Sequence, residues 1–139
     1  MSYQENYQKW VDFAELPDYL RQDLENMDEK TKEDAFYTNL EFGTAGMRGL
    51  IGAGTNRINI YVVRQATEGL ARLIESKGGN EKERGVAIAY DSRHFSPEFA
   101  FESAAVLAKH GIKSYVFESL RPTPELSFAV RHLNCFAGI

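Results

Sequence analysis

A short segment in the first half of the chain combines the residue types that bind anions. Within residues 42–49 the glycines, the hydroxyl and the cation stand in the order Gly43, Thr44, Gly46, Arg48, Gly49. Glycines let successive backbone N–H groups turn toward one point and form a nest for an anion. An arginine adds a rigid fork of donors that suits phosphate or carboxylate. The segment therefore predicts a loop that holds a phosphorylated ligand, and the glycine spacing alone leaves a tight turn with a surface arginine as the alternative.

Other well-known chemical motifs do not occur in the chain. No Gly-Lys-Ser/Thr follows the glycines, so the segment is not a Walker loop, and Gly-x-Gly-x-x-Gly is also missing. Gly-x-Ser-x-Gly, His-Glu-x-x-His and Asp-x-Asp-x-Thr do not occur either. The single cysteine, Cys135, stands in an apolar run and is interpreted as a small buried hydrophobe. With neither Cys-x-x-Cys nor His-x-x-x-His spacing, the sequence predicts no metal site.

Composition limits the classes of partner. The chain has 139 residues, of which 43% are hydrophobic and 26% charged, as in a soluble globular domain. Its net charge of −4 and pI near 5.4 argue against nucleic acid as a partner. An anionic ligand would need a locally positive site, for which the loop arginines Arg48, Arg57, Arg93 and Arg121 are the candidates. No signal peptide or transmembrane run is visible, so we expect a cytoplasmic protein with no membrane partner.

The first third of the chain predicts helices followed by a glycine-rich hairpin. Tyr7, Trp10, Val11 and Ala14 lie on one face of a helix, which Pro17 breaks. A second stripe consists of Leu20, Leu24 and Met27. The mixed charges of residues 28–34 indicate a solvated helix face or connection. The glycines of residues 43–54 exclude a regular helix, and we expect strand, loop and strand there.

The remaining sequence alternates helices and strands. Asn59 is expected to cap a helix over residues 60–77 with inward positions Val63, Ala66, Leu70, Leu73 and Ile74. Strands are expected at residues 85–90, at residues 113–117 and from residue 135. Ser96 and Thr123 are expected to cap the two helices that begin with Pro97 and Pro124. This βαβ pattern predicts a parallel sheet with right-handed crossovers.

Ligands of open α/β sheets bind outside the carboxyl ends of the strands. The segments Asp91–His94 and Glu118–Arg121 each follow a predicted strand, so we expect both at one edge of the sheet. Asp91 is interpreted as structural, either pairing with Arg93 or capping the turn. A catalytic role for His94 is not favoured, because a surface position explains it equally well.

Four stretches together resemble one enzyme family. Phe-Gly-Thr-Ala-Gly-Met-Arg-Gly resembles the first signature loop of the phosphohexomutases, the family of phosphoglucomutase and phosphomannomutase. Residues 59–71 resemble the helix after that loop, and Ala89–Ser96 and Arg121–Pro124 resemble the family's Asp-x-Arg and Thr-Pro turns. The resemblance covers essentially residues 35–139. The helical lead-in is most similar to bacterial phosphoglucomutases and their phosphopentomutase relatives.

The resemblance implies a three-layer α/β/α sandwich with a mixed, mostly parallel sheet, preceded by an N-terminal helical arm. It implies a helical extension at residues 1–38 and a truncated domain I at residues 39–139. The family's catalytic serine lies in a Thr-Ala-Ser-His-Asn-Pro loop that this resemblance places beyond Ile139. The chain therefore supplies no catalytic serine and should be inactive alone. An apolar end at Phe-Ala-Gly-Ile also suggests truncation and an incompletely satisfied sheet edge near Ile139.

For the site, the resemblance implies that Thr44 and Arg48, with Gly43 and Gly46, bind phosphate beside the phosphoserine and that Arg93 supports them. The parent enzyme would interconvert hexose 1-phosphate and hexose 6-phosphate, using Mg²⁺ and hexose 1,6-bisphosphate that this fragment's own residues do not bind. Its partners would be the sugar phosphate and the remaining domains of the same polypeptide. The sugar itself is undetermined, because the sugar-reading loop is absent.

Three alternatives to a phosphohexomutase domain remain open. A phosphopentomutase domain would differ in its sugar. A stand-alone phosphate- or nucleotide-binding α/β module would leave the Asp-Ser-Arg and Thr-Pro turns incidental. An interaction domain with a helical arm would leave the glycine loop buried or facing a partner, with no affinity for anions.

Overall fold

The structure is a computed structural model that describes residues 2–44 and 46–139. Ala45 of the glycine-rich segment lies outside the described residues. The chain divides into two compact units. The first ends at Val62, and the second runs from Val63 to Ile139. The division falls within the long helix α4, Ile60–Lys77.

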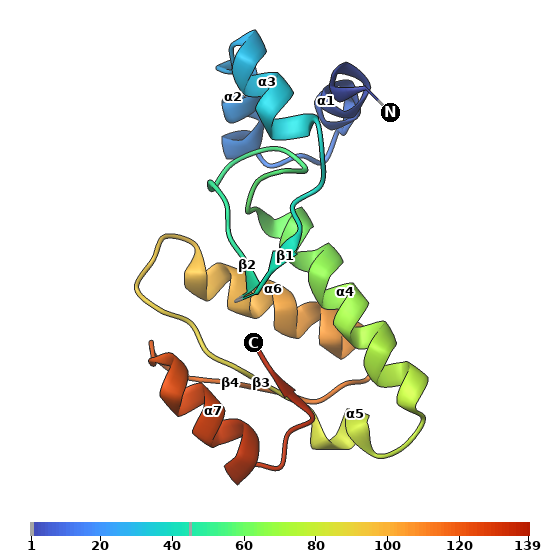
Figure 1. Ribbon diagram of the computed structural model, residues 1–139, viewed down its shortest axis with the longest axis vertical. Helices are drawn as coiled ribbons and strands as arrows, with labels where there is room; N and C mark the ends of the chain where they lie inside the picture. The colour runs from blue at the N-terminus through green and yellow to red at the C-terminus, as the bar shows by residue number, and fades with distance from the viewer. Residues whose placement is uncertain (1, 45) are drawn as a thin grey trace. The chain divides into compact units, whose positions relative to one another are not determined.

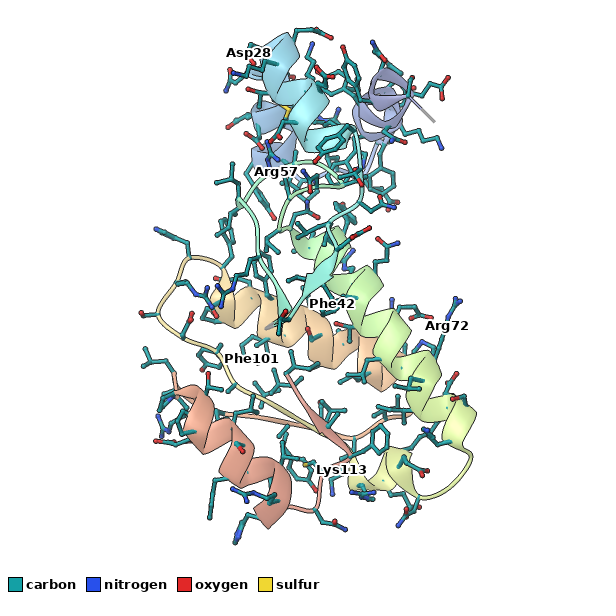
Figure 2. The ribbon with its side chains drawn as sticks, viewed as in Figure 1. Asp28, Phe42, Arg57, Arg72, Phe101 and Lys113 are labelled. Atoms are coloured by element: carbon teal, nitrogen blue, oxygen red, sulfur yellow. The ribbon has the colours of Figure 1, made fainter. Side chains whose placement is uncertain are left out.

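The first unit begins with three helices, which are α1 (Tyr3–Asp12), α2 (Asp18–Glu25) and α3 (Glu29–Phe36). A capping box starts α1, because the Ser2 hydroxyl accepts the Glu5 N–H while the Glu5 carboxylate accepts the Ser2 N–H. Asp28 caps α3 by accepting the Thr31 N–H at 2.7 Å (Figure 2), and hydrogen bonding with the side chain and then the backbone N–H of Thr31 lowers the pKa of Asp28. The stretch 28–34 is therefore the start of a helix, with its charges facing solvent.

Phe36 is the centre of the first unit's core. It is completely buried at the end of α3 and meets Tyr7 and Trp10 edge-on, with ring centroids 5.5 and 5.8 Å away. The buried aliphatic side chains around it are Leu16, Leu20, Leu24, Ala35 and Ala53. Leu20 and Leu24 belong to the second predicted helical stripe, whereas Ala53 comes from the glycine-rich segment. The helical arm and that segment therefore share one core.

A short hairpin follows the helices. Strand β1 (Phe42–Gly43) pairs antiparallel with β2 (Gly46–Met47), placing Phe42 opposite Met47 and Gly43 opposite Gly46. Gly46 has a φ of 101°, which residues with a Cβ rarely adopt. The two predicted strands are thus present, but they lie at Phe42–Gly43 and Gly46–Met47, and the prediction of a strand farther on in residues 48–54 is wrong.

The second unit has three layers. Its parallel sheet has the order β4–β3–β5, formed by Ser114–Val116, Val86–Ile88 and Ala137–Gly138 (Figure 1). One face of β3 packs on α4 and α6 (Ser96–Lys109), and the other packs on α7 (Thr123–His132). A single helical turn, α5 (Glu81–Arg84), precedes β3. The predicted α/β/α class is confirmed, with the described three-stranded sheet entirely parallel and the antiparallel pair in the hairpin.

Two predicted helix caps are wrong. The residue before α6 is Phe95, whose φ is 64°, and the Ser96 hydroxyl instead accepts the Asp91 N–H at 3.2 Å. Helix α7 begins at Thr123 after Pro122, with no side-chain cap. Both prolines still stand in the first turn, where their missing N–H costs little.

Helix α4 follows its prediction more closely. The Asn59 side chain accepts the Tyr61 and Val62 N–H groups at 3.1 and 3.0 Å, which confirms it as the cap. Ile74 is buried as expected, but Leu73 is 49% exposed. The predicted inward position of Leu73 is therefore wrong, because the packing of the second unit leaves about half of this residue in solvent.

His110 ties three helices of the second unit together. It stands at the end of α6, and its two ring nitrogens lie 2.7 Å from Glu68 Oε2 and 2.8 Å from Glu75 Oε1, both on α4. Lys82 of α5 donates to the His110 carbonyl and to Glu75, while Arg72 pairs with Glu68. Two carboxylates facing both nitrogens favour the imidazolium, so the hydrogen bonds that its ring donates to Glu75 and Glu68 raise the pKa of His110. The same contacts lower the pKa of Glu68 and of Glu75.

We expect the stability that His110 contributes to depend on pH. Because its folded-state pKa is raised, the contribution is fully present below the unfolded value of 6.5 and is lost as pH rises through the folded value. The pKa values of Glu68 and Glu75 are lowered in the folded protein. The stability that these two glutamates contribute is therefore present above their ordinary pKa of 4.5 and is lost as the pH falls through the folded-state values. The Tm of the protein should therefore exceed the Tm of the His110→Gln variant by most between pH 4.5 and pH 6.5. A difference that grew toward alkaline pH would contradict the assignment.

Gly46 should be sensitive to a methyl group, whereas Gly69 should not. A Cβ at either position would meet no atom within 4 Å, so only backbone conformation separates them. Gly46→Ala should cost about 1–2 kcal/mol because of the positive φ. Gly69→Ala, in the middle of α4, should stabilise by about 0.5–1 kcal/mol. Urea unfolding measures the change in the free energy of unfolding for each variant. Equal changes for Gly46→Ala and Gly69→Ala would argue against the positive φ at Gly46.

Candidate functional site

The hairpin brings four of the five predicted site residues together. Gly43 and Gly46 face each other as a strand pair, Thr44 lies in the connection between them, and Arg48 comes directly after β2. Thr44 and Arg48 are exposed. Such a turn, with a hydroxyl and a guanidinium in solvent, offers hydrogen-bond donors to an anion without breaking existing contacts.

Contacts on both sides fix the base of the hairpin. Before β1, the Leu40 N–H donates to the Thr55 carbonyl at 2.8 Å. After β2, the Ile58 N–H donates to the Leu50 carbonyl, also at 2.8 Å. Gly49 packs on Leu40, because a Cβ there would lie 3.1 Å from a Leu40 methyl carbon. The segment from residue 50 to residue 59 therefore holds both ends of the hairpin.

The structure separates the four candidate loop arginines. Arg57 is only 7% exposed, and its guanidinium pairs with Asp34 at 2.8 Å, so its proposed place in a positive site is wrong (Figure 2). Arg93 pairs with Asp91, and Arg121 pairs with Glu125. Arg48 is exposed and takes part in no ion pair among the residues that the structure describes. The other three arginines each pair with a carboxylate, and Arg48 has no such partner among the described residues.

The Asp91 turn lies in the second unit, at the carboxyl end of β3. Asp91 accepts the Arg93 N–H at 3.0 Å with one oxygen and the Arg93 Nε–H at 2.7 Å with the other. These hydrogen bonds, the backbone one foremost, lower the pKa of Asp91. The structural interpretation of Asp91 is thus confirmed. The Arg93 side chain is 82% exposed, so its terminal amino groups remain accessible.

The expected edge of the sheet exists within the second unit. The Arg121 N–H donates to the Tyr90 carbonyl at 3.0 Å, joining the loops that follow β4 and β3. The Ala89 N–H donates to the Ile139 carbonyl at 2.9 Å, so β5 ends beside the same loop. The parallel strands thus bring the Asp91 turn, Arg121 and Ile139 to one edge. His94 is exposed beside Phe95, with ring centroids 6.3 Å apart.

Cys135 and the acidic side chains offer no further chemistry. Cys135 is 3% exposed, and burial raises the pKa of its thiol, which fits a buried apolar role. Over residues 2–44 and 46–139, no three His, Cys, Asp or Glu side chains converge as a metal site requires. No helix in these ranges is both long and apolar enough to cross a membrane.

Sequence reasoning missed the polar residues that hold the site in place. Asn59 was expected only as a cap, but its amide also donates to the Gly52 and Gly54 carbonyls at 2.9 Å. Asp23 was not singled out, yet its carboxylate accepts the Ala53 N–H at 2.7 Å. Asp23 and Ala53 are 30 residues apart, so no local pattern could have linked them.

Comparisons with known proteins agree with this fold. Residues 39–139 match the family model described as phosphoglucomutase/phosphomannomutase, alpha/beta/alpha domain I. A phosphoglucomutase of Staphylococcus epidermidis is 40% identical over 131 residues, which is 94% of this chain and 23% of the relative. Phosphoglucomutases of Staphylococcus aureus and Staphylococcus haemolyticus are 45% and 43% identical over 108 residues, which is 78% of this chain and 19% of each relative.

The chain thus spans about a fifth of the length of these curated relatives. The alignment to the S. epidermidis protein covers all but a few residues, so it extends into the helical arm. No solved structure matches the chain. The family model covers well over half of the residues, and the sheet with helices on both faces agrees with its description. The chain therefore belongs to the phosphoglucomutase/phosphomannomutase family, of which it carries the α/β/α domain I.

Proposed function

We propose that this chain is the phosphate-handling first domain of a phosphoglucomutase that interconverts glucose 1-phosphate and glucose 6-phosphate. The names of the relatives support glucose as the sugar. A phosphoserine, carried on the polypeptide after Ile139, donates its phosphoryl group to one hydroxyl of the sugar. The bisphosphate turns over in the site and returns its other phosphoryl group to the serine. Each transfer breaks one P–O bond and forms another, so the phosphoryl count is unchanged over the cycle.

The state of Arg48 is the observation that carries this proposal. It is exposed, has no ion-pair partner among the described residues, and follows a glycine hairpin whose connection holds Thr44. Phosphoryl transfer depends on positioning and on donors that stabilise the charge of the transferring oxygens. A guanidinium with free donors, the Thr44 hydroxyl and the N–H groups near Gly43 and Gly46 meet that need.

Arg93 is proposed as a supporting residue of the same reaction. Its backbone and Nε are held by Asp91, which leaves the terminal amino groups for an anion. Because Ile139 ends beside Ala89, polypeptide continuing from β5 would leave at the edge that carries the Asp91 turn. That arrangement supports a phosphoserine loop close to Arg93.

The remaining components are assigned to the rest of the enzyme. The donor set of the described residues does not fit Mg²⁺, so no step is assigned to a metal here. In the proposal Mg²⁺ is held elsewhere in the polypeptide, the bisphosphate is the reaction intermediate, and the protein works in the cytoplasm. Exposed apolar side chains, among them Phe42, Leu50 and Phe128, support contact with further domains.

We also propose that the chain consists of a helical extension at residues 1–38 and a domain at residues 39–139. This division rests on the family match, which begins at residue 39. The compact units divide elsewhere, after Val62, because the arm shares its core with the glycine-rich segment. The boundary at residue 39 follows the sequence similarity to the family, whereas the boundary after Val62 follows the packing of the chain.

Arg48→Ala in the full-length enzyme should lower kcat by about 10²–10³, because one donor to the transferring phosphoryl group is lost. Thermal unfolding should hardly change, since Arg48 is exposed. Arg48→Lys should recover only part of the rate, because an ammonium cannot reproduce the fork. Arg131→Ala, an exposed arginine of α7, is the matched control. A coupled assay with glucose 1-phosphate measures all three, and an unchanged kcat for Arg48→Ala would refute this role.

The 139-residue chain by itself should have no mutase activity. The proposal places the phosphoserine after Ile139, so the chain has no nucleophile to carry the phosphoryl group between the two positions. Assaying the chain beside the full-length enzyme, with glucose 1,6-bisphosphate present, tests this expectation. Turnover by the isolated chain above the background would show that the nucleophile lies within it.

A further inference from the structure

We propose that Asp23 of the N-terminal helical arm is a positioning residue for the glycine hairpin and acts on the reaction through Arg48. This inference rests on the proposed function, since it assigns Arg48 to the phosphoryl group. Its evidence lies entirely within the first unit.

The first contact is between the arm and the turn that follows the hairpin. Asp23, on α2, accepts the Ala53 N–H at 2.7 Å through Oδ2. Ala53 is completely buried in the arm's core beside Leu20 and Leu24. The carboxylate therefore satisfies a backbone donor that folding removes from water, and leaving that donor unpaired would be costly.

Helix α3 makes a second set of contacts with the same segment. The Asn56 N–H donates to the Ala35 carbonyl at 2.9 Å, and the Asn56 amide donates to the Asp34 carbonyl at 3.0 Å. Arg57, nearly buried, pairs with the Asp34 carboxylate and donates to the Asn56 carbonyl. The segment is thus hydrogen-bonded to two helices of the arm.

Close packing leaves the segment little freedom. A Cβ at Gly54 would lie 2.6 Å from the Ala35 carbonyl oxygen, so the backbone runs directly against the end of α3. On the other side, the Asn59 amide holds the Gly52 and Gly54 carbonyls. The backbone from Gly52 to Asn59 is fixed from both directions.

The hairpin takes its position from this segment. The Thr55 carbonyl accepts the Leu40 N–H before β1, and the Ile58 N–H reaches the Leu50 carbonyl two residues after Arg48. A chain of hydrogen bonds therefore runs from Asp23 through residues 50–59 to both ends of the hairpin. Loosening the Asp23 contact should shift Arg48, and a displacement of about 1 Å can cost about 10²-fold in rate.

The test is a double-mutant cycle in the full-length enzyme, assayed with glucose 1-phosphate. Asp23→Leu removes the acceptor and should lower kcat/KM by about 10- to 100-fold. In an Arg48→Ala background the same change should have little further effect, because the residue through which Asp23 acts is gone. Asp23→Asn keeps an oxygen that can accept the Ala53 N–H, so it should retain most of the activity. Glu25→Ala, an exposed carboxylate on the same helix, is the matched control and should behave as the parent.

Arg57→Met provides a second variant if Asp23→Leu does not fold. It removes the link to Asp34 without stranding a buried charge, and its loss of kcat/KM should likewise vanish when Arg48 is alanine. Equal losses in both backgrounds would show a general structural role and overturn the inference, as would an Asp23→Leu enzyme with full activity. If Arg48→Ala alone left kcat/KM unchanged, the proposed function of the hairpin would itself fail, a result distinct from a failure of Asp23 alone.

Discussion

The first unit depends on satisfying the backbone of an irregular segment that is pressed against a helical core. Residues 50–59 form no regular secondary structure beyond one isolated bridge, from Ile51 to Ile58. Buried N–H and carbonyl groups in such a segment need partners from elsewhere. Asn59, Asp23 and the end of α3 supply them. The glycine hairpin therefore stands on a rigid base, although it has only two residues in each strand.

The second unit solves a different problem with regular structure. Short parallel strands are covered on both faces, so Val86 and Ile88 face one helical layer and Ala87 faces the other. Two of its polar clusters lie at the ends of elements, with His110 at the end of α6 and Asp91 after β3. Loops at the carboxyl edge are thereby held by the sheet, where ligands of such folds bind.

Charge pairing decides which arginines remain available for an anion. Arg57, Arg93 and Arg121 each face a carboxylate, whereas Arg48 has none among the described residues. A buried guanidinium such as Arg57 needs its partner, because an unpaired charge in that position would be costly. On the hairpin, Arg48 is exposed to solvent. Arg48, the arginine proposed to bind phosphate, thus takes no part in the ion pairs that join the described residues.

Local chemistry in the sequence determined much of this protein. Apolar periodicity gave the helical stripes and α4, the continuous apolar run gave β3, and the glycines gave the hairpin, since each signal acts over a few residues. The predicted cap at Ser96 is wrong because its hydroxyl bonds to the Asp91 N–H of the preceding loop, and the one at Thr123 is wrong because the helix already begins at that residue. Only the tertiary structure decided that Asp23 meets Ala53 and that Arg57 is buried on Asp34. Such contacts join residues more than 20 positions apart, where spacing along the chain carries no information about distance.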